Sequence, residues 1–304
     1  MTRSPQHLIR TRMERRLAAL EEAEHTTPIT FSIVGVQKGA TSTVFRMLAR
    51  HRLIAAGPEK EMRHFMNEKQ DWSAPDLSDY RRPARHPRQR VAGDATPEYV
   101  FWPHALERMA AYDASMPIIA SFRDPIERAF SQWSMERSRD VDFPDLPVTI
   151  EEWASAELPA EIPAGLSPYE YRRRSLYVRG LYGQQLERGY RSFPREQWLS
   201  LDFREVTGKP EATLDRLTDH LGLPRFKAYP EALHRNQTPT VNTGASPTVE
   251  HIEALVRTFA DDLRLFAELS GVDVSGWPTV RAAAGELDLR EFRDRLVGKL
   301  GLPL

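Results

Sequence analysis

The sequence predicts an α/β protein with a central, mainly parallel β-sheet flanked by helices. Short apolar runs, several of them rich in β-branched residues, alternate with segments of helical periodicity, and glycine or proline turns end the runs. Strands that alternate with helices in this way form parallel sheets covered on both faces. No internal repeat or linker divides the sequence, so we expect a single domain over residues 1–304.

The first predicted strand is the apolar run 29–34, which stops at Gly35. Residues 43–50 then have helical spacing, so a strand, a glycine loop and a helix follow one another. The second and third strands are expected over 52–56 and 90–94, because a turn containing proline follows each of them.

The fourth predicted strand, 117–123, has the strongest apolar signal. A helix is expected to follow it as far as about residue 138. Asp124 is suited to cap this helix, Pro125 fits its first turn, and Glu127 completes a capping box.

The later elements are expected in this order: an irregular stretch at 140–168 that is rich in proline and acids, a helix at 176–190, a fifth strand at 197–203, and a helix at 211–221. A helical extension is expected over 1–28 and a helical tail over 279–304. The charge pattern of the tail suits packing on the domain or the formation of a homodimer.

The composition excludes several classes of protein. Lys and Arg number 42 against 43 Asp and Glu, so no overall basic field favours nucleic acid as a partner. The absence of cysteine excludes disulfides, thiolate metal sites and a cysteine nucleophile. The longest uncharged apolar stretch, about 26–37, is far shorter than the roughly 20 residues that span a bilayer. We therefore expect a cytoplasmic protein with no membrane partner.

The loop from Gly35 to Thr43 has the composition of a phosphate-binding loop, with two glycines, a lysine and three hydroxyls between strand and helix. Its backbone amides can surround a phosphate, while the helix dipole and Lys38 add positive charge. It departs from the nucleoside-triphosphatase pattern, because Lys38 precedes Gly39 and no magnesium-binding hydroxyl follows the lysine. The alternative is a glycine turn that only joins the two elements.

The end of the fourth strand offers a second anion site. Arg123 closes this strand, and Ser131 follows eight residues later on the predicted helix. Both side chains can bind a second phosphate. For Arg123 the alternative is an ion pair with Asp124 or Glu127. Ligands of open parallel sheets bind at the carboxyl ends of the strands, where both candidate sites lie.

Together these segments resemble the sulfotransferases that use 3′-phosphoadenosine 5′-phosphosulfate (PAPS), in particular the heparan-sulfate-type and bacterial small-molecule branch. Residues 35–43 are similar to the family's loop for the 5′-phosphosulfate, and 123–131 to its 3′-phosphate motif. Between them, Lys60-Glu61 followed by Phe65, and residues 93–99, are similar to two further family segments. The resemblance covers about residues 30–278.

The resemblance implies a P-loop-kinase-like sulfotransferase fold, with PAPS as co-substrate, 3′-phosphoadenosine 5′-phosphate (PAP) as product and no metal. The acceptor is expected to be the hydroxyl or amine of a small phenolic or glycosylated metabolite. The cofactor-binding residues that the resemblance implies are Gly35, Gln37, Lys38, Gly39, Ala40, Thr41, Ser42, Thr43, Arg123, Ser131 and Tyr182. The polar stretch 236–246 is expected where extracellular-type relatives close a late cofactor loop with a disulfide.

The resemblance also implies catalytic roles. Lys38 would stabilise the charge that develops on the bridging oxygen, and Glu61 is the preferred general base. Because the ordinary pKa of glutamate is near 4.3, burial would have to raise the pKa of Glu61, whereas Lys60 would lower it. His64 is the second catalytic candidate and Asp94 the third. Their alternatives are a salt bridge for Glu61 and a pocket wall for His64.

Two other functions stay open from the sequence alone. A regulatory or scaffold protein could bind the same nucleotide without turnover, and a small-molecule kinase would require ATP and magnesium. The aromatic residues at 99–102 favour an apolar or phenolic acceptor, whereas the arginines between 81 and 90 favour an anionic one.

Overall fold

The computed structural model describes residues 25–57, 59–230, 240–241 and 243–304. Its central sheet has five strands in the order β3-β5-β2-β6-β7, and every neighbouring pair is parallel. In chain order these strands are β2 (Phe31–Gly35), β3 (Ile54–Ala55), β5 (Val91–Asp94), β6 (Ile118–Phe122) and β7 (Trp198–Asp202). The predicted class, a mainly parallel sheet flanked by helices, is confirmed.

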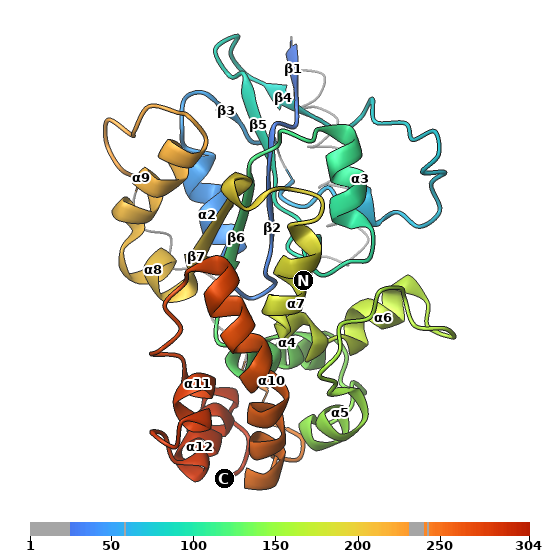
Figure 1. Cartoon of the computed structure of the whole chain (residues 1–304), viewed down its shortest axis with the longest axis vertical. Helices are drawn as coiled ribbons and strands as arrows, with labels where there is room; N and C mark the ends of the chain where they lie inside the picture. Colours follow the sequence, from blue (N-terminus) through green and yellow to red (C-terminus); the bar gives the residue numbers. More distant parts are fainter. Residues whose placement is uncertain (1–24, 58, 231–239, 242) are drawn as a thin grey trace, which may run out of the picture.

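Helices cover both faces of the sheet (Figure 1). In chain order they are α2 (Thr41–Leu48), α3 (Ala105–Tyr112), α4 (Pro125–Arg139), α5 (Leu146–Trp153), α6 (Pro168–Arg174), α7 (Tyr182–Gly189), α8 (Phe203–Gly208), α9 (Pro210–His220), α10 (Val249–Ser270), α11 (Pro278–Ala283) and α12 (Leu289–Leu300). Short 3-10 turns occur at η1 (His64–Met66), η2 (Val178–Gly180) and η3 (Arg195–Gln197).

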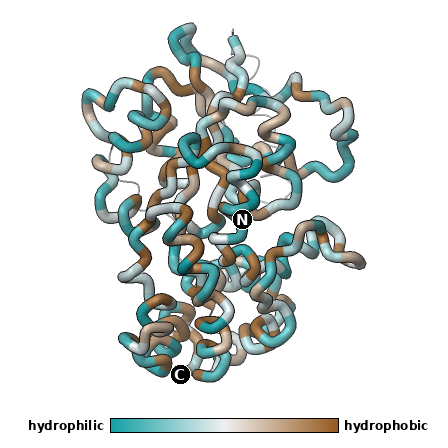
Figure 2. The backbone as a smooth tube through the Cα atoms, in the orientation of Figure 1, coloured by the Kyte–Doolittle hydropathy of each residue, from teal (hydrophilic) through white to brown (hydrophobic). Residues whose placement is uncertain are grey.

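The alternation of side chains along the strands divides the core into two layers. In β6, Ile118, Ala120 and Phe122 pack toward α3, α7 and α10, whereas Ile119 packs toward α2, α8 and α9. All residues of β6 are buried, as expected for a parallel strand covered on both faces. Figure 2 shows hydrophobic residues along these central strands and mostly hydrophilic residues along the outer loops.

A separate pair of strands lies outside the sheet and corrects one prediction. Residues 25–28, expected within a helical extension, form β1 (His25–Pro28), which pairs antiparallel with β4 (Arg81–Ala84). The two strands pair across 52 intervening residues, a long-range contact that local periodicity does not reveal. Residues 1–24 of the expected extension lie outside the described residues.

The segment between α4 and β7 is more helical than predicted. The stretch 140–168 contains α5, in which Pro147 occupies the first turn, where proline is tolerated. The helix predicted over 176–190 is shorter, because η2 precedes α7 and only 182–189 are α-helical. Residues 279–304 contain most of α11 and the whole of α12.

The carboxyl ends of the strands point toward a group of helices formed by α4, α5, α6, α10, α11 and α12 (Figure 1). α4 begins only three residues after β6 ends, and Asp124 caps it by accepting a hydrogen bond from the Glu127 backbone, as predicted. Among the described residues, no helix is both long and apolar enough to cross a membrane.

Candidate active site

The loop between β2 and α2 is held tightly against the end of β6. The Val36 amide donates to the Ser121 carbonyl at 3.0 Å, and the Gly39 amide turns back to the Val36 carbonyl at 2.9 Å. A Cβ atom on Gly39 would lie only 2.2 Å from the Ser121 carbonyl oxygen. Only glycine therefore fits this position without a movement of the backbone.

The loop holds two non-glycine residues in the left-handed region. Lys38 has φ 70° and Ala40 has φ 67°. Such conformations cost about 1–3 kcal/mol each and are concentrated at functional sites. Here they turn successive peptide units around the loop, the geometry that gathers backbone amides into an anion-binding concavity.

Helix α2 begins without a side-chain cap. Ala40 occupies the N-cap position, and no side-chain hydrogen bond satisfies the first amides of the helix. These amides and the positive end of the helix dipole face the loop, an arrangement that suits a phosphate or sulfate group. Thr41 is buried, and Ser42 and Thr43 are half-buried in the same turn.

The Lys38 amine has a pKa well below the ordinary value of a lysine. Its burial, together with the charges of Arg123, Arg139 and Arg128, lowers its pKa to about 8, against a weaker opposing effect of Glu136. Its ammonium group forms no hydrogen bond and no ion pair within the part of the chain that the structure describes. An anion bound between Lys38 and Arg123 would relieve this repulsion.

Glu61 lies beside the loop but is already paired. Lys60 Nζ is 3.1 Å from Glu61 Oε1, and Arg63 Nη2 donates to Glu61 Oε2 at 2.6 Å. Burial alone would raise the pKa of Glu61, but Lys60 and Arg63 outweigh it, and the pKa lies below its ordinary value. Lys60 also donates to the Thr41 hydroxyl at 3.2 Å, which connects Glu61 to the start of α2.

Asp94 organises the segment that carries Glu61. Its fully buried carboxylate accepts hydrogen bonds from the Met62 amide, the Thr96 hydroxyl and the Tyr80 hydroxyl at 3.0–3.1 Å. The Thr96 hydroxyl in turn accepts from the Arg63 amide at 3.1 Å. The contacts of Asp94 therefore position the neighbouring loop.

His64 lies in an aromatic cluster, with ring centroids 5.4 Å from Phe65 and 5.2 Å from Tyr80. Its Nε2 is buried with no hydrogen-bond partner among the described residues. Burial lowers its pKa despite the nearby carboxylate of Asp94, so the neutral imidazole is favoured. These contacts are those of a pocket wall, and a role for His64 as the base stays a prediction.

Arg123 is aimed along the first turns of α4. It forms a long ion pair with Glu127, at 3.3 Å from Nη2 to Oε2, and its guanidinium lies 4.7 Å above the Phe203 ring. Glu127 also binds Lys299 of α12 at 2.9 Å. The ion pair considered as the alternative for Arg123 is thus present, within a cluster that has a surplus of positive charge.

Tyr182 and Ser131 support this end of the site from the core. Tyr182 is fully buried, and its hydroxyl donates to the backbone carbonyl of Arg123 at 2.8 Å. It therefore positions Arg123 from behind. Ser131 is 3% exposed on α4, two helical turns beyond the helix start.

Comparison with known proteins adds to this geometry. No protein-family model matches the sequence. The human heparan sulfate glucosamine 3-O-sulfotransferases 3B1 and 3A1 are each 29% identical over 200 residues, which is 64% of this chain. The chain covers 46% and 44% of their lengths, so it spans less than half of these relatives. A sulfotransferase structure from Alicyclobacillus acidocaldarius shares the fold, with a TM-score of 0.62 and 22% identity over 82% of this chain and 98% of that one.

The chain is thus similar in sequence to known sulfotransferases. Its five-stranded parallel sheet with flanking helices is the sulfotransferase fold. Sulfotransferases as a family use PAPS. The two segments predicted to bind anions, the loop after β2 and the end of β6, lie at adjacent strand ends of the sheet.

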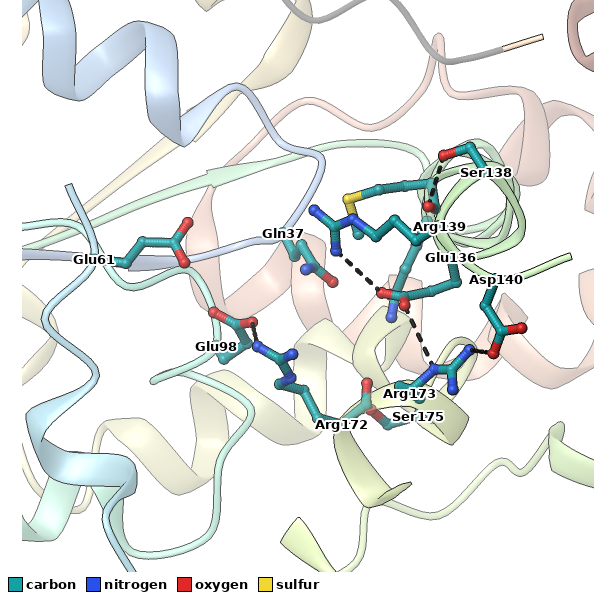
Figure 3. A network of polar contacts seen from close by, with 12 residues as sticks. Gln37, Glu61, Glu98, Glu136, Ser138, Arg139, Asp140, Arg172, Arg173 and Ser175 are labelled. Carbon is teal, nitrogen blue, oxygen red and sulfur yellow. Dashed lines mark hydrogen bonds and ion pairs between the residues drawn. The ribbon is translucent and has the colours of Figure 1, made fainter. Parts of the chain in front are cut away.

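Sequence reasoning gave no role to two carboxylates of this candidate site, those of Glu98 and Glu136. Figure 3 shows the carboxylates of Glu98 and Glu136 in a polar network with Arg172 and Arg173, around Gln37. Glu136 lies 3.6 Å from Arg173, and Glu98 lies 3.9 Å from Arg172. The members of this network come from separate segments of the chain, and no local motif connects them.

Arg179 is a further residue that sequence reasoning missed, and it is buried, at 3% exposure. It donates hydrogen bonds to Gln37 Oε1 at 2.6 Å and to Ser175 Oγ at 2.8 Å. Burial lowers its pKa to about 10, while Glu98 opposes this effect. A lone arginine in the otherwise uncharged run 176–182 was the signal that could have identified it.

Proposed function

We propose that this protein transfers a sulfuryl group from PAPS to a hydroxyl or amine of a small-molecule acceptor. The observation that carries the proposal is the arrangement of Lys38, a half-buried cation without an ion-pair partner in the described residues, between an uncapped helix N-terminus and Arg123. These groups provide positive charge and backbone donors at two adjacent points, as a nucleotide with phosphates at both ends requires.

The chain's own groups fit the 5′ end of PAPS. Gly39 lets the loop approach β6 closely, and the left-handed residues Lys38 and Ala40 shape a concavity of amides. The amides of residues 40–42 and the half-buried Ser42 and Thr43 hydroxyls would hold the phosphosulfate oxygens. PAPS supplies a sulfuryl group that is already joined to a phosphate leaving group.

Lys38 would act on the oxygen that joins the sulfuryl group to the 5′-phosphate. Negative charge collects on this oxygen as the bond to sulfur breaks, and a fixed cation stabilises the transition state more than the ground state. A pKa of about 8 leaves the amine mainly protonated at neutral pH. A bound anion would raise this pKa and secure the charge.

Arg123 and Ser131 would hold the 3′-phosphate. The contact of Arg123 with Glu127 is long, at 3.3 Å, so Arg123 can exchange it for a shorter, charge-assisted hydrogen bond to a phosphate at the start of α4. Tyr182 keeps the backbone of Arg123 in place through its hydroxyl.

Glu61 is the proposed general base. Its neighbours Lys60 and Arg63 keep it ionised and hold it beside Thr41 at the loop. The same charges make it a weak base, so proton removal would accompany transfer to sulfur. Asp94 would serve as a positioning residue, because its carboxylate already accepts three hydrogen bonds.

Calorimetric titration tests this proposal. We expect PAP to bind tightly and ATP with magnesium to bind weakly. Arg123→Ala should weaken PAP binding at least tenfold, while Arg191→Ala, which alters an exposed arginine, should leave it unchanged. A preference for ATP would contradict the proposal. PAP binding without transfer to any hydroxyl or amine in a broad acceptor panel would instead indicate a nucleotide-binding regulatory protein.

A further inference from the structure

Glu98 occupies a special position beside the phosphate-binding loop. It follows β5 in a turn that crosses the end of β2, where the Val100 amide donates to the Val34 carbonyl at 3.1 Å. The side chain of Val100 packs against Gly35, the first residue of the loop. Figure 3 shows the Glu98 carboxylate near Gln37 and Arg172, within the polar network of the site.

The carboxylate of Glu98 is buried without donors. The residue is 1% exposed, and neither carboxylate oxygen has a hydrogen-bond partner among the described residues. Its closest cation, Arg172 Nη1, lies 3.9 Å from Oε1, which is beyond hydrogen-bond distance. A buried carboxylate without donors is costly, and such groups mark sites where a ligand or water completes the bonding.

The charge of Glu98 is nevertheless compensated. Arg172 is its ion-pair partner, and the charge of Glu98 also acts on the guanidinium groups of Arg63 and Arg179. Arg63 and Arg179 direct their hydrogen bonds elsewhere, to Glu61 and to Gln37. What Glu98 lacks is therefore hydrogen-bond donors and not a counter-charge.

Glu98 has neighbours that contact both parts of the proposed transfer site. Arg179 connects it electrostatically to Gln37, the residue before Lys38, and Arg63 connects it to Glu61. Lys38 and Glu61 are the residues proposed for the chemistry. Each has an arginine close by, Arg179 or Arg63, whose pKa the charge of Glu98 raises. A molecule positioned between Lys38 and Glu61 would have its nearby polar groups within reach of this carboxylate.

We propose that Glu98 binds the acceptor directly and selects a neutral group in which a second hydroxyl lies next to the hydroxyl that receives the sulfuryl group. The reacting hydroxyl would donate to Glu61, and the neighbouring hydroxyl would donate to a bare oxygen of Glu98 without disturbing the balance of charge. A carboxylate on the acceptor would meet Glu98 as a like charge, and an ammonium would add a cation beside three arginines. This inference rests on the proposed function.

The test uses the chain of residues 1–304, PAPS and acceptors in matched sets. One set is methyl β-glucoside, glucosamine and glucuronate, which share a ring and differ in charge. The other set is catechol and phenol, which differ by the adjacent hydroxyl. We expect the neutral glucoside and catechol to be the better substrates. Glu98→Gln should raise their KM roughly ten- to a hundredfold, the effect of losing a charged hydrogen-bond acceptor.

Control variants separate this role from folding and from cofactor binding. Glu211→Gln, at an exposed position, should leave every constant unchanged. PAP affinity should be the same in wild type and Glu98→Gln. Glu98→Asp retains the charge but withdraws it by one methylene, so its KM should lie between the values of wild type and Glu98→Gln.

Several outcomes would overturn the inference. One is an unchanged KM in Glu98→Gln, and another is a loss of kcat alone together with a loss of its pH dependence, which would identify Glu98 as the base. A preference of the wild type for glucosamine, glucuronate or phenol would also contradict it, as would PAP binding with no turnover of methyl β-glucoside or catechol. Failure of the wild type to bind PAP would instead reject the proposed function.

Discussion

Arg179 donates a 2.6 Å hydrogen bond to Gln37 across 142 positions of sequence, and this bond joins the turn before α7 to the loop between β2 and α2. The guanidinium is buried and also binds Ser175 Oγ and the Arg172 carbonyl, so its orientation is fixed from three directions. The backbone of the loop is thus supported by a residue that need not touch the cofactor.

Gln37→Ala should destabilise the protein, because it removes one acceptor from the buried Arg179 guanidinium. We expect the free energy of unfolding to fall by about 1–3 kcal/mol, the cost of leaving a buried charged donor without its partner. Urea denaturation followed by circular dichroism measures this change. Gln70→Ala, which alters a long and exposed hydrogen bond at 3.4 Å, should change the stability by much less. Equal effects of the two substitutions would contradict the supporting role.

Lys38→Ala should lower the rate of sulfuryl transfer by roughly a hundred- to a thousandfold, the effect of removing one donor to a developing negative charge. The measurement is kcat with PAPS and the best acceptor of the panel. A decrease of less than about threefold would exclude the role assigned to Lys38.

The affinity for PAP should depend on pH through Lys38. Its pKa of about 8 in the free protein means that the amine is protonated at pH 7 and largely neutral at pH 9.5. Because the anion binds the protonated form, the dissociation constant should rise above pH 8, by up to about tenfold per pH unit. Calorimetry between pH 7 and 9.5 checks this. In Lys38→Ala the profile should be flat, and a persistent rise would assign the titration to another group.

Gly39→Ala should destabilise the loop and weaken PAP binding, because the new Cβ would lie 2.2 Å from the Ser121 carbonyl oxygen. Overpacking of this kind costs about 1–3 kcal/mol. Gly208→Ala is a matched control, since nothing lies within 4 Å of a Cβ at that position. Thermal denaturation and calorimetry with PAP should separate the two variants. A Gly39→Ala protein as stable as Gly208→Ala would contradict the close approach to β6.

The strands, and the glycine loop that joins β2 to α2, could be predicted because their signals are local. Apolar runs such as 117–123 extend over several residues, and Asp124 caps the following helix within three positions, so neither signal depends on the rest of the chain. The pair β1 and β4, and the start of α6 at Pro168, were missed. β1 needs a distant partner, and the capping box of Ser167 and Glu170 lies inside a segment whose proline and acid content masks it.

The sequence by itself determined the order of the sheet-forming segments and the position of Lys38 and Arg123 at two strand ends, because strand termini in a parallel sheet meet at one edge. Only the tertiary structure decided which partners each charged side chain of the site has. It paired Glu61 with Lys60 and Arg63, and it left Glu98 buried without donors. Burial and the distance between charges set these properties, and both depend on residues that are far apart in the sequence.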